Sequence, residues 1–329
     1  MSCALITGVA GQDGSYLAEL LLEKNYEVHG LVRQNTSLER LDSIQESTSD
    51  FKSRFFLHNV DLDDSAALHA SMARASPSEI YHLAAQSHVG LSFKQIESTC
   101  ESVAFGTLRL LEAALALPKP PRIFHASSSE IFGKPETVPQ DETTRMNPVN
   151  PYGAAKVFAT QMVSIYREKF GLFACNGILY NHESPRRGLD FVTRKICRAA
   201  ARIQSGEQKE LLIGDISARR DWGHARDYVR GMWLALQHET AEDFVFATGQ
   251  THSVEDVLKI AFEEAGLNWQ KYVQIHQTLL RAEEPRQLIG NAAKAQRLLG
   301  WRPEISFEQL IVEMVQFEMR ALRRKNVAD

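Results

Sequence analysis

The segment between residues 127 and 156 concentrates the side chains of this chain that are best suited to chemistry. Ser128 offers a hydroxyl, Glu130 a carboxylate and Tyr152 a phenol, and Lys156 follows the tyrosine by four residues. Four residues make just over one helical turn, so Tyr152 and Lys156 share a face if the segment is helical. A cation beside a phenol favours the phenolate, so the spacing predicts a tyrosine that acts as a base near neutral pH.

Residues 3–14 have the pattern of a dinucleotide-binding turn. Residues 3–7 form a short apolar run, which predicts a buried parallel strand. Gly8, Gly11 and Gly14 follow, and leucines at helical spacing come next. Glycines let the backbone approach a pyrophosphate, and the N-terminus of the following helix attracts it. The alternative is a tight turn between strand and helix that binds no ligand.

The end of the second predicted strand, residues 26–32, indicates which nucleotide is bound. Arg33 stands 19 residues after the last of these glycines, where NAD-binding folds place an acidic residue for the ribose 2′-hydroxyl. An arginine would pair with a 2′-phosphate, so we expect NADP, with a solvated surface arginine as the alternative. Asn35 adds hydrogen-bonding capacity to the same loop. Asp61, after the third predicted strand, either accepts from the adenine amino group or caps the next helix.

Strand and helix patterns alternate over about the first 180 residues, which predicts an α/β fold with a Rossmann-like, doubly wound parallel sheet. A polar, proline-broken stretch at residues 181–188 then interrupts the pattern. We expect residues 1–180, with about 220–250 returning to them, to form the cofactor-binding domain. Residues 181–219 and about 251–329 would form a smaller, mixed α/β substrate domain.

The bulk composition excludes several classes of function. The net charge of -4 argues against nucleic-acid binding and against a polybasic membrane surface. No apolar run has the length of a membrane span, and the N-terminal residues lack the pattern of a signal peptide. The four cysteines are scattered without a CxxC pair, so we expect reduced thiols, a cytoplasmic location and no metal site.

Cations and hydrogen-bonding groups in the C-terminal half suggest a site for a diphosphate, because arginine suits bidentate recognition of phosphate. Each arginine taken alone is more simply a solvated surface residue, so the prediction requires that several converge. Glu284 could accept from a guanine base, or it could be a solvated glutamate. The other residues of this group are Asn181, Arg187, Lys195, Arg220 and Arg281.

Four motifs together resemble the extended short-chain dehydrogenase/reductase superfamily. They are T-G-x-x-G-x-x-G, L-A-A-Q-S, S-S-S-E-x-F-G and Y-x-x-x-K. Three longer stretches, at residues 180–188, 191–195 and 220–228, resemble the GDP-mannose 4,6-dehydratases. The resemblance spans nearly the whole chain.

This resemblance implies a role for each matching residue. Ser128 stands where the family usually has a catalytic threonine, Glu130 matches its acid/base, Tyr152 its base and Lys156 the helper of that tyrosine. Cofactor contacts are implied at Gly8, Gly11, Gln12, Asp13, Gly14, Arg33, Asn35, Asp61, Leu62, Leu83, Ala84, Ala85, Gln86, Ser87, Tyr152, Lys156, His182 and Arg187. Substrate contacts are implied at Ser87, Ser128, Ser129, Glu130, Asn181, Val192, Lys195, Arg220, Arg281 and Glu284.

The resemblance also implies a reaction that converts GDP-mannose to GDP-4-keto-6-deoxymannose and water, a step toward GDP-fucose or GDP-rhamnose. A hydride would pass from C4 to tightly bound NADP and return to C6. Tyr152 would take the C4 hydroxyl proton, and Ser128 would hydrogen-bond the C4 oxygen. Glu130 would remove the C5 proton, which a 4-keto group makes acidic, and would assist the loss of water.

Three alternatives stay open from the sequence. A GDP-manno-heptose dehydratase would use nearly the same contacts. A nucleotide-sugar epimerase or 4-ketoreductase shares the Y-x-x-x-K motif, and a non-catalytic NADPH-binding regulator would share the fold. A carboxylate at residue 130 favours a dehydratase, because a simple reductase needs only the tyrosine and the lysine.

The chain departs from the family pattern at three places. The loop after Arg33 is shorter than the arginine- and serine-rich run that helps to build the family's tetramer, so we expect a homo-oligomer that is either a dimer or a tetramer. Ser98 replaces a tyrosine that is usual near the cofactor. R-A-E-E-P at residues 281–285 replaces R-P-T-E-V, which keeps two charges and loses the proline's restraint on the backbone.

Overall fold

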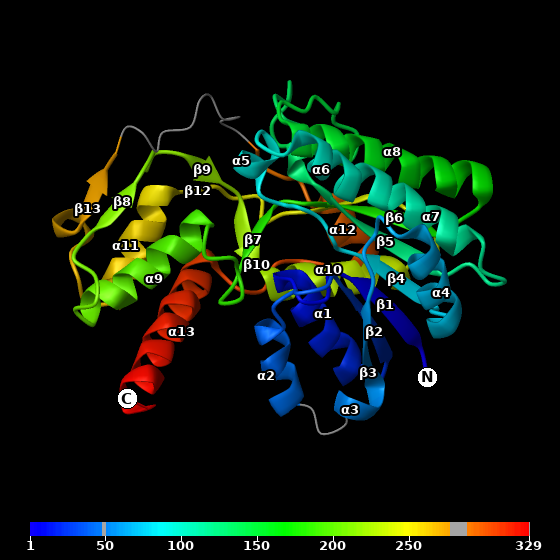
Figure 1. Ribbon diagram of the computed structural model, residues 1–329. Helices are drawn as coiled ribbons and strands as arrows, with labels where there is room; N and C mark the ends of the chain where they lie inside the picture. The colour runs from blue at the N-terminus through cyan, green and yellow to red at the C-terminus, as the bar shows by residue number, and fades with distance from the viewer. Residues whose placement is uncertain (48–50, 277–287, 329) are drawn as a thin grey trace.

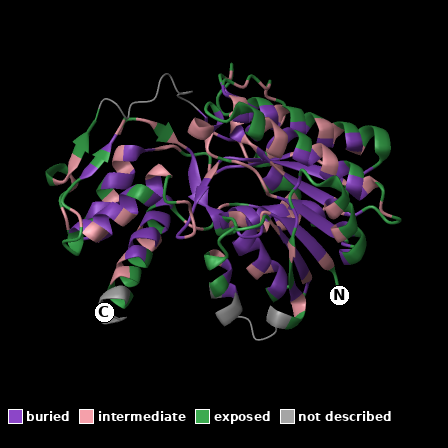
Figure 2. Ribbon diagram, viewed as in Figure 1, coloured by how far each residue is buried: buried purple, intermediate pink, exposed green. Residues whose placement is uncertain are grey.

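The structure is a computed structural model that describes residues 1–47, 51–276 and 288–328. Its centre is a seven-stranded parallel sheet in the order β11-β6-β5-β4-β1-β2-β3, which confirms the predicted α/β fold (Figure 1). Most of the strands are buried on both faces, as their continuous apolar sequences require (Figure 2). The strands are β1 Cys3–Thr7, β2 Glu27–Val32, β3 Phe55–Asn59, β4 Glu79–His82, β5 Arg122–Ser128, β6 Ala174–Leu179 and β11 Phe244–Phe246.

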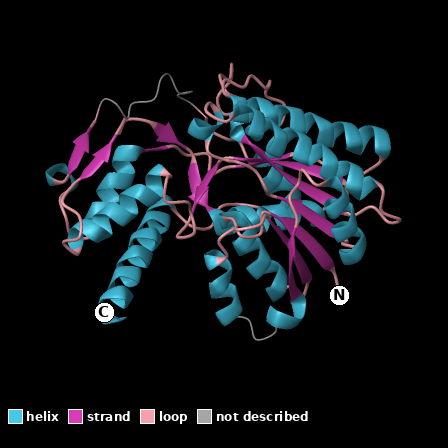
Figure 3. Ribbon diagram, viewed as in Figure 1, coloured by secondary structure: helices cyan, strands magenta, loops and turns pink. Residues whose placement is uncertain are grey.

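Helices cover both faces of this sheet (Figure 3). On one face, α1 (Gln12–Glu23) and α10 (Ala225–Gln237) pack together over a core that contains Phe124 and Phe246. On the other face, α4 (Ser65–Ala75), α7 (Gly106–Leu115) and α8 (Pro151–Phe170) enclose Ile123, Val163 and their neighbours. This doubly wound arrangement brings the carboxyl ends of the strands to one edge, where such folds bind ligands.

A second lobe lies beside the sheet (Figure 1). Its core is formed by α9 (Val192–Gln204), α11 (Val254–Glu264) and α13 (Phe307–Ala328), with the short strands β8 (Leu211–Ile213) and β13 (Val273–Ile275) outside them. Ser253 and Asp256 form a capping box at the start of α11. Among the described residues, no helix is both long and apolar enough to span a membrane.

Short elements complete the described chain. They include α12 (Ala293–Leu299), which packs against β11 and α10 and so lies with the sheet. The others are α2 Glu39–Ser47, α3 Phe51–Arg54, α5 Val89–Ser92, α6 Ile96–Cys100, η1 Glu101–Phe105, η2 Ser129–Ile131, β7 Asn181–Glu183, β9 Arg219–Arg220, β10 Trp222–His224, β12 His252–Ser253 and η3 Trp269–Lys271.

Two buried aspartates hold the chain together where it passes between the lobes. Asp221 accepts hydrogen bonds from the backbone nitrogens of Thr248 at 2.8 Å and Gly249 at 2.9 Å. Asp227 accepts from the backbone nitrogens of Glu304 at 2.9 Å and Ile305 at 3.1 Å. These two carboxylates therefore link the 220–228 stretch to residues 248–249 and 304–305 through hydrogen bonds to backbone nitrogens.

Candidate active site

The carboxyl end of β5 and the first turns of α8 bring the predicted catalytic residues together. β5 ends at Ser128, and η2 carries Glu130 directly after it. Tyr152 and Lys156 lie one turn apart on the buried face of α8, as their spacing predicted, and are only 7% and 3% exposed. Glu130 and Ser128 both interact electrostatically or by hydrogen bonding with the Tyr152 phenol. The four groups therefore form one cluster.

Asn150 connects the two halves of this cluster. Its Nδ2 donates to Glu130 Oε2 at 2.7 Å, while its Oδ1 accepts from Gly153 N at 2.8 Å and so caps α8. A glycine is needed at position 153 for the start of α8 to lie this close to Glu130, because a Cβ there would lie 2.6 Å from the backbone oxygen of Glu130. Asn150 was not among the predicted site residues. The available signal was an asparagine immediately before a helix that begins with proline.

The pKa of Tyr152 is raised in this arrangement, rather than lowered as the spacing predicted. Burial raises the pKa of Tyr152 to about 12, and the hydrogen bond with Ser128 only partly opposes that effect. The Lys156 Nζ lies 5.9 Å from the centroid of the tyrosine ring and donates to the backbone oxygen of Ala126 at 2.6 Å. The effect of burial on the pKa of Tyr152 is therefore larger than any effect of the Lys156 charge.

The glycine-rich turn has the close packing that a dinucleotide site requires. Gly8 adopts φ +71°, and a Cβ there would lie 2.9 Å from the Cα of Ala84. A Cβ at Gly14 would lie 2.3 Å from the backbone oxygen of Gly8. The side chain of Thr7 accepts from the backbone nitrogens of Leu83 and Ala84, both at 3.1 Å. The turn and the 83–87 loop, both predicted to contact the cofactor, therefore lie side by side, and glycines at the start of a helix suit the close approach of a pyrophosphate.

The first turn of α1 is bonded to the segment that leads into the second lobe. Gln12 Nε2 donates to the backbone oxygen of His182 at 3.1 Å, and Ser184 Oγ donates to Gln12 Oε1 at 2.8 Å. Asp13 Oδ2 lies 2.8 Å from His182 Nε2. Burial opposes charge on both partners, yet their mutual attraction lowers the pKa of Asp13 and raises that of His182. The pair is therefore a largely buried ion pair at the first turn of α1, next to the predicted cofactor-binding turn.

The remaining predicted cofactor residues lie around the same edge. Arg33 is exposed directly after β2, and Asn35 adopts φ 64° in the turn that follows. Asp64, not Asp61, caps α4, because its Oδ1 accepts from Ala67 N at 2.9 Å. The capping alternative for Asp61 is therefore wrong. Leu62 is buried against Gly106, which indicates a packing role, and Gln86 Nε2 donates to the backbone oxygen of His88 at 3.2 Å within its own loop.

The predicted substrate residues divide between the two lobes. Asn181 opens β7, which pairs in parallel with β10, and Val192 begins α9. Lys195 donates to the backbone oxygen of Leu212 at 2.8 Å, so it lies on the second lobe, as does Arg220 in β9. Arg187 Nε lies 3.1 Å from Glu183 Oε2 and stacks on Phe191. Ser87 and Ser129 follow β4 and β5, and the two predicted contacts Arg281 and Glu284 fall outside the described residues.

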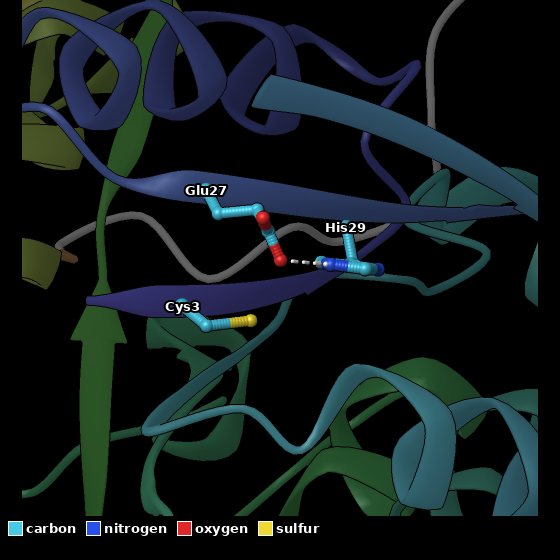
Figure 4. A group of neighbouring side chains, drawn as sticks. All are labelled: Cys3, Glu27 and His29. Atoms are coloured by element: carbon cyan, nitrogen blue, oxygen red, sulfur yellow. Dashed lines mark hydrogen bonds and ion pairs between the residues drawn. The ribbon is translucent and has the colours of Figure 1, made fainter. Parts of the chain in front are cut away.

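A group of possible metal ligands lies at the opposite edge of the sheet. Cys3, Glu27 and His29 place one ligand atom each within 4.8 Å of the others (Figure 4). His29 Nε2 is 2.9 Å from Glu27 Oε1, and the Cys3 thiol donates to the backbone oxygen of Ala75 at 3.3 Å. Burial raises the pKa of Cys3 to about 11, with a contribution from Glu27. A metal would need the thiolate, so these contacts favour a hydrogen-bonded cluster at the start of β1 and β2.

A glycine-rich turn at the carboxyl edge of a parallel sheet, beside a helix that presents tyrosine and lysine, defines a class of enzyme. The class is the extended short-chain dehydrogenase/reductase superfamily, whose members bind NAD(P). Within this class, the family model for GDP-mannose 4,6 dehydratase matches residues 5–314. The chain belongs to the GDP-mannose 4,6-dehydratase family.

Individual relatives are consistent with this assignment. GDP-mannose 4,6 dehydratase 2 of Arabidopsis thaliana is 47% identical over 98% of this chain and 88% of its own length. One similar solved structure is that of DesIV, a dTDP-glucose 4,6-dehydratase from Streptomyces venezuelae with NAD and TYD bound. Its TM-score is 0.85 and its sequence identity is 24%, and the match covers 99% of this chain and 98% of the DesIV chain. UDP-glucose 4-epimerase from Thermotoga maritima has the same TM-score and identity, over 97% and 99% of the two chains. The fold is therefore common to dehydratases and epimerases.

Proposed function

We propose that the protein is a GDP-mannose 4,6-dehydratase that forms GDP-4-keto-6-deoxymannose and water. The observation that carries this proposal is the carboxylate of Glu130, held by Asn150 beside the Tyr152 phenol. Oxidation or reduction at C4 needs only a tyrosine and a cation, whereas loss of water across C5 and C6 needs a group that moves a proton at carbon. The match to the family over nearly the whole chain supports the same reaction.

The residues would divide the proton transfers between them. NADP supplies the hydride acceptor for C4 and the hydride donor for C6. Ser128 hydrogen-bonds the C4 oxygen, and Tyr152 accepts its proton. Glu130 would remove the C5 proton and deliver it to the departing C6 hydroxyl, which leaves as water. The proton that Tyr152 took from the C4 hydroxyl would pass to C5 when the hydride reaches C6. Because burial disfavours the ionised phenol, the charge of Lys156 is needed to make Tyr152 an effective base.

We propose that the cofactor is NADP because of Arg33. Its guanidinium is exposed at the carboxyl end of β2, the position from which such folds contact the adenosine ribose. A guanidinium pairs with the 2′-phosphate of NADP, whereas NAD offers only a hydroxyl there. We further propose that the sheet-bearing part of the chain binds NADP and that the second lobe, with Lys195 and Arg220, binds the GDP-sugar.

A homo-oligomer is also part of the proposal. Apolar side chains are exposed along the outer face of α6, η1 and α8: Ile96 is 54% exposed, Phe105 46% and Phe158 39%. The rings of Phe105 and Phe158 have centroids 6.0 Å apart, so they form one continuous patch. A face of this kind is typical of a contact with a second copy of the chain. The four cysteines are unpaired, which fits the cytoplasmic location that we propose.

The test is a product analysis with purified protein and GDP-mannose that carries deuterium at C4. We expect GDP-4-keto-6-deoxymannose with the deuterium at C6 and no net reduction of NADP. Deuterium that is lost or retained at C4 would contradict the mechanism.

The same assay separates the alternatives. An epimerase, whose fold this chain shares, would return a hexose that keeps its C6 hydroxyl, and a 4-ketoreductase would consume NADPH. Parallel incubation with GDP-manno-heptose tests the related dehydratase.

A further inference from the structure

Buried polar side chains line the sheet face that packs against α8, close to Lys156. His82 on β4 and His125 on β5 are cross-strand partners with ring centroids 5.8 Å apart, and Asn176 follows on β6. All three are at most 2% exposed. The proposed mechanism uses none of them, so the reason for three buried polar groups must lie elsewhere.

Hydrogen bonds determine which nitrogen of His82 carries the proton. Thr107 Oγ1 donates to the backbone oxygen of Val103 at 2.7 Å, so it can only accept from His82 Nε2, 3.0 Å away. Thr7 Oγ1 already accepts from two backbone nitrogens and therefore donates to His82 Nδ1 at 2.8 Å. Both ring nitrogens of His82 are thus satisfied in the neutral form.

The same reasoning leaves one atom of His125 without a partner. Asn176 Nδ2 donates to Thr160 O at 3.1 Å and to Asp243 Oδ1 at 3.0 Å, and both of these oxygens only accept. Asn176 Oδ1 must therefore face His125, whose Nδ1 carries the proton and donates at 2.9 Å. His125 Nε2 then holds a lone pair, and it is buried without a hydrogen-bond partner in the described part of the chain.

Lys156 is a donor with unused capacity, and its charge acts on His125. An ammonium has three N–H groups, and one of them goes to the backbone oxygen of Ala126, the residue after His125 on β5. Thr160, one turn after Lys156 on α8, already contacts this network through Asn176. Burial is the main reason that the pKa of His125 is low, and the charge of Lys156 lowers it further, so the two groups interact.

We propose that His125 is a positioning residue whose Nε2 accepts a hydrogen bond from the Lys156 ammonium through one buried water. This contact stabilises the charged form of the lysine, which Tyr152 needs in order to act as a base. The link to turnover rests on the proposed function, whereas the contact itself is a property of the protein without substrate. The other titratable or charged groups that act on Lys156, His125 or Tyr152 are His82 from β4, Glu130 from η2, Asp13 from α1 and Arg187 from the loop before α9.

The pKa of Lys156 provides the direct test. Burial lowers it to about 7, so a lost acceptor should lower it further. Protein labelled with carbon-13 at the lysine ε-carbons is titrated by NMR without cofactor, and Lys156→Arg assigns the signal. We expect His125→Phe to lower the pKa by about one unit, a tenfold change. His125→Gln should restore most of it, because its Oε1 can accept.

A matched control removes a histidine away from the site. His58→Phe on β3 should leave the Lys156 titration unchanged. An unchanged titration in folded His125→Phe would overturn the proposal, since a merely structural histidine would affect stability alone. If His125→Phe does not fold, His125→Met carries the same expectation with a more adaptable side chain.

Activity gives a second readout. The alkaline limb of the pH profile of kcat/KM should move to lower pH in His125→Phe, because Lys156 would lose its charge sooner, and His125→Gln should resemble the parent. Failure of the parent protein to turn over GDP-mannose would contradict the proposed function. The NMR titration would still decide the role of His125.

Discussion

Asn150 Nδ2 donates to Glu130 Oε2 at 2.7 Å, and the same amide caps α8 through Gly153. One side chain therefore both starts the helix that carries Tyr152 and orients the carboxylate proposed to remove the C5 proton. These two roles can be separated experimentally, because an aspartate retains the capping oxygen and loses the donor.

Asn150→Asp should reduce kcat by about 10- to 100-fold with little change in stability. The new carboxylate would face Glu130, and two adjacent carboxylates cannot both be ionised without repulsion. A proton shared between them would block proton removal from C5, and the acidic limb of the kcat profile should move to higher pH. Steady-state kinetics against pH, with thermal unfolding as the control, measures both effects. Unchanged kcat in a stable variant would contradict the positioning role of Asn150.

Glu130→Gln should bind NADP normally and lose dehydration by at least about 100-fold. The amide keeps the size and can still meet Asn150, but it cannot accept a proton from carbon. Cofactor binding is measured by fluorescence titration and turnover by product formation. A more specific readout is exchange of the C5 hydrogen with solvent, which should also cease. Turnover at the parent rate would remove Glu130 from the mechanism.

Arg33→Asp should shift cofactor preference from NADP toward NAD. An aspartate accepts from the ribose 2′-hydroxyl and repels a 2′-phosphate, so both changes act in the same direction. The ratio of the two dissociation constants, measured by calorimetry, should change by about 100-fold, which corresponds to roughly 3 kcal/mol. Arg74→Asp, on the exposed end of α4, is a matched charge control. Equal losses of affinity for NADP and NAD would indicate that Arg33 does not contact the 2′ position.

Acid should destabilise the protein in part through His82. Burial, with a smaller contribution from Lys156, lowers its pKa to about 3 in the folded chain, whereas an unfolded histidine titrates near 6.5. The unfolded state therefore binds more protons below pH 6.5, and stability is lost as the pH falls from there toward 3. His182 opposes this trend, because its raised pKa favours the folded state at low pH.

His82→Asn isolates the contribution of His82. Between pH 7 and pH 5, the free energy of unfolding should fall by about 2 kcal/mol less in this variant than in the parent. Urea unfolding at each pH measures the difference, and the parent serves as its own reference at pH 7. The same slope in both proteins would show that His82 does not titrate in this way.

Local sequence patterns were sufficient for the sheet and for the helix that carries Tyr152 and Lys156. Continuous apolar runs and four-residue spacing are local features, so β1 spans the predicted residues 3–7, and Tyr152 and Lys156 share a face of α8. The glycine turn was predictable for the same reason. Gly8 lies close to Ala84, which is far away in the sequence, but only a glycine permits this contact, so the glycine itself indicates it.

Contacts between distant segments were not predictable in this way. The raised pKa of Tyr152 depends on how deeply the sheet and α8 bury it, and residue spacing cannot report burial. Asn150 was missed because its partner Glu130 lies 20 residues earlier in the sequence. Asp61 and Asp64 lie in one aspartate-rich stretch, so the sequence alone does not determine which of them caps α4. The cap is Asp64, about one helical turn after Asp61.

The hydrogen bonds from Gln12 and Ser184, together with the Asp13–His182 pair, have a consequence for how the two lobes communicate. The N-terminal turn of α1 and the strand that leads out of the sheet behave as one mechanical joint. By thermodynamic reciprocity, a nucleotide that favours the arrangement in which these contacts are made raises the affinity for a sugar that favours the same arrangement, and the sugar raises the affinity for the nucleotide by the same factor. Such a joint would keep one cofactor molecule in place over many turnovers.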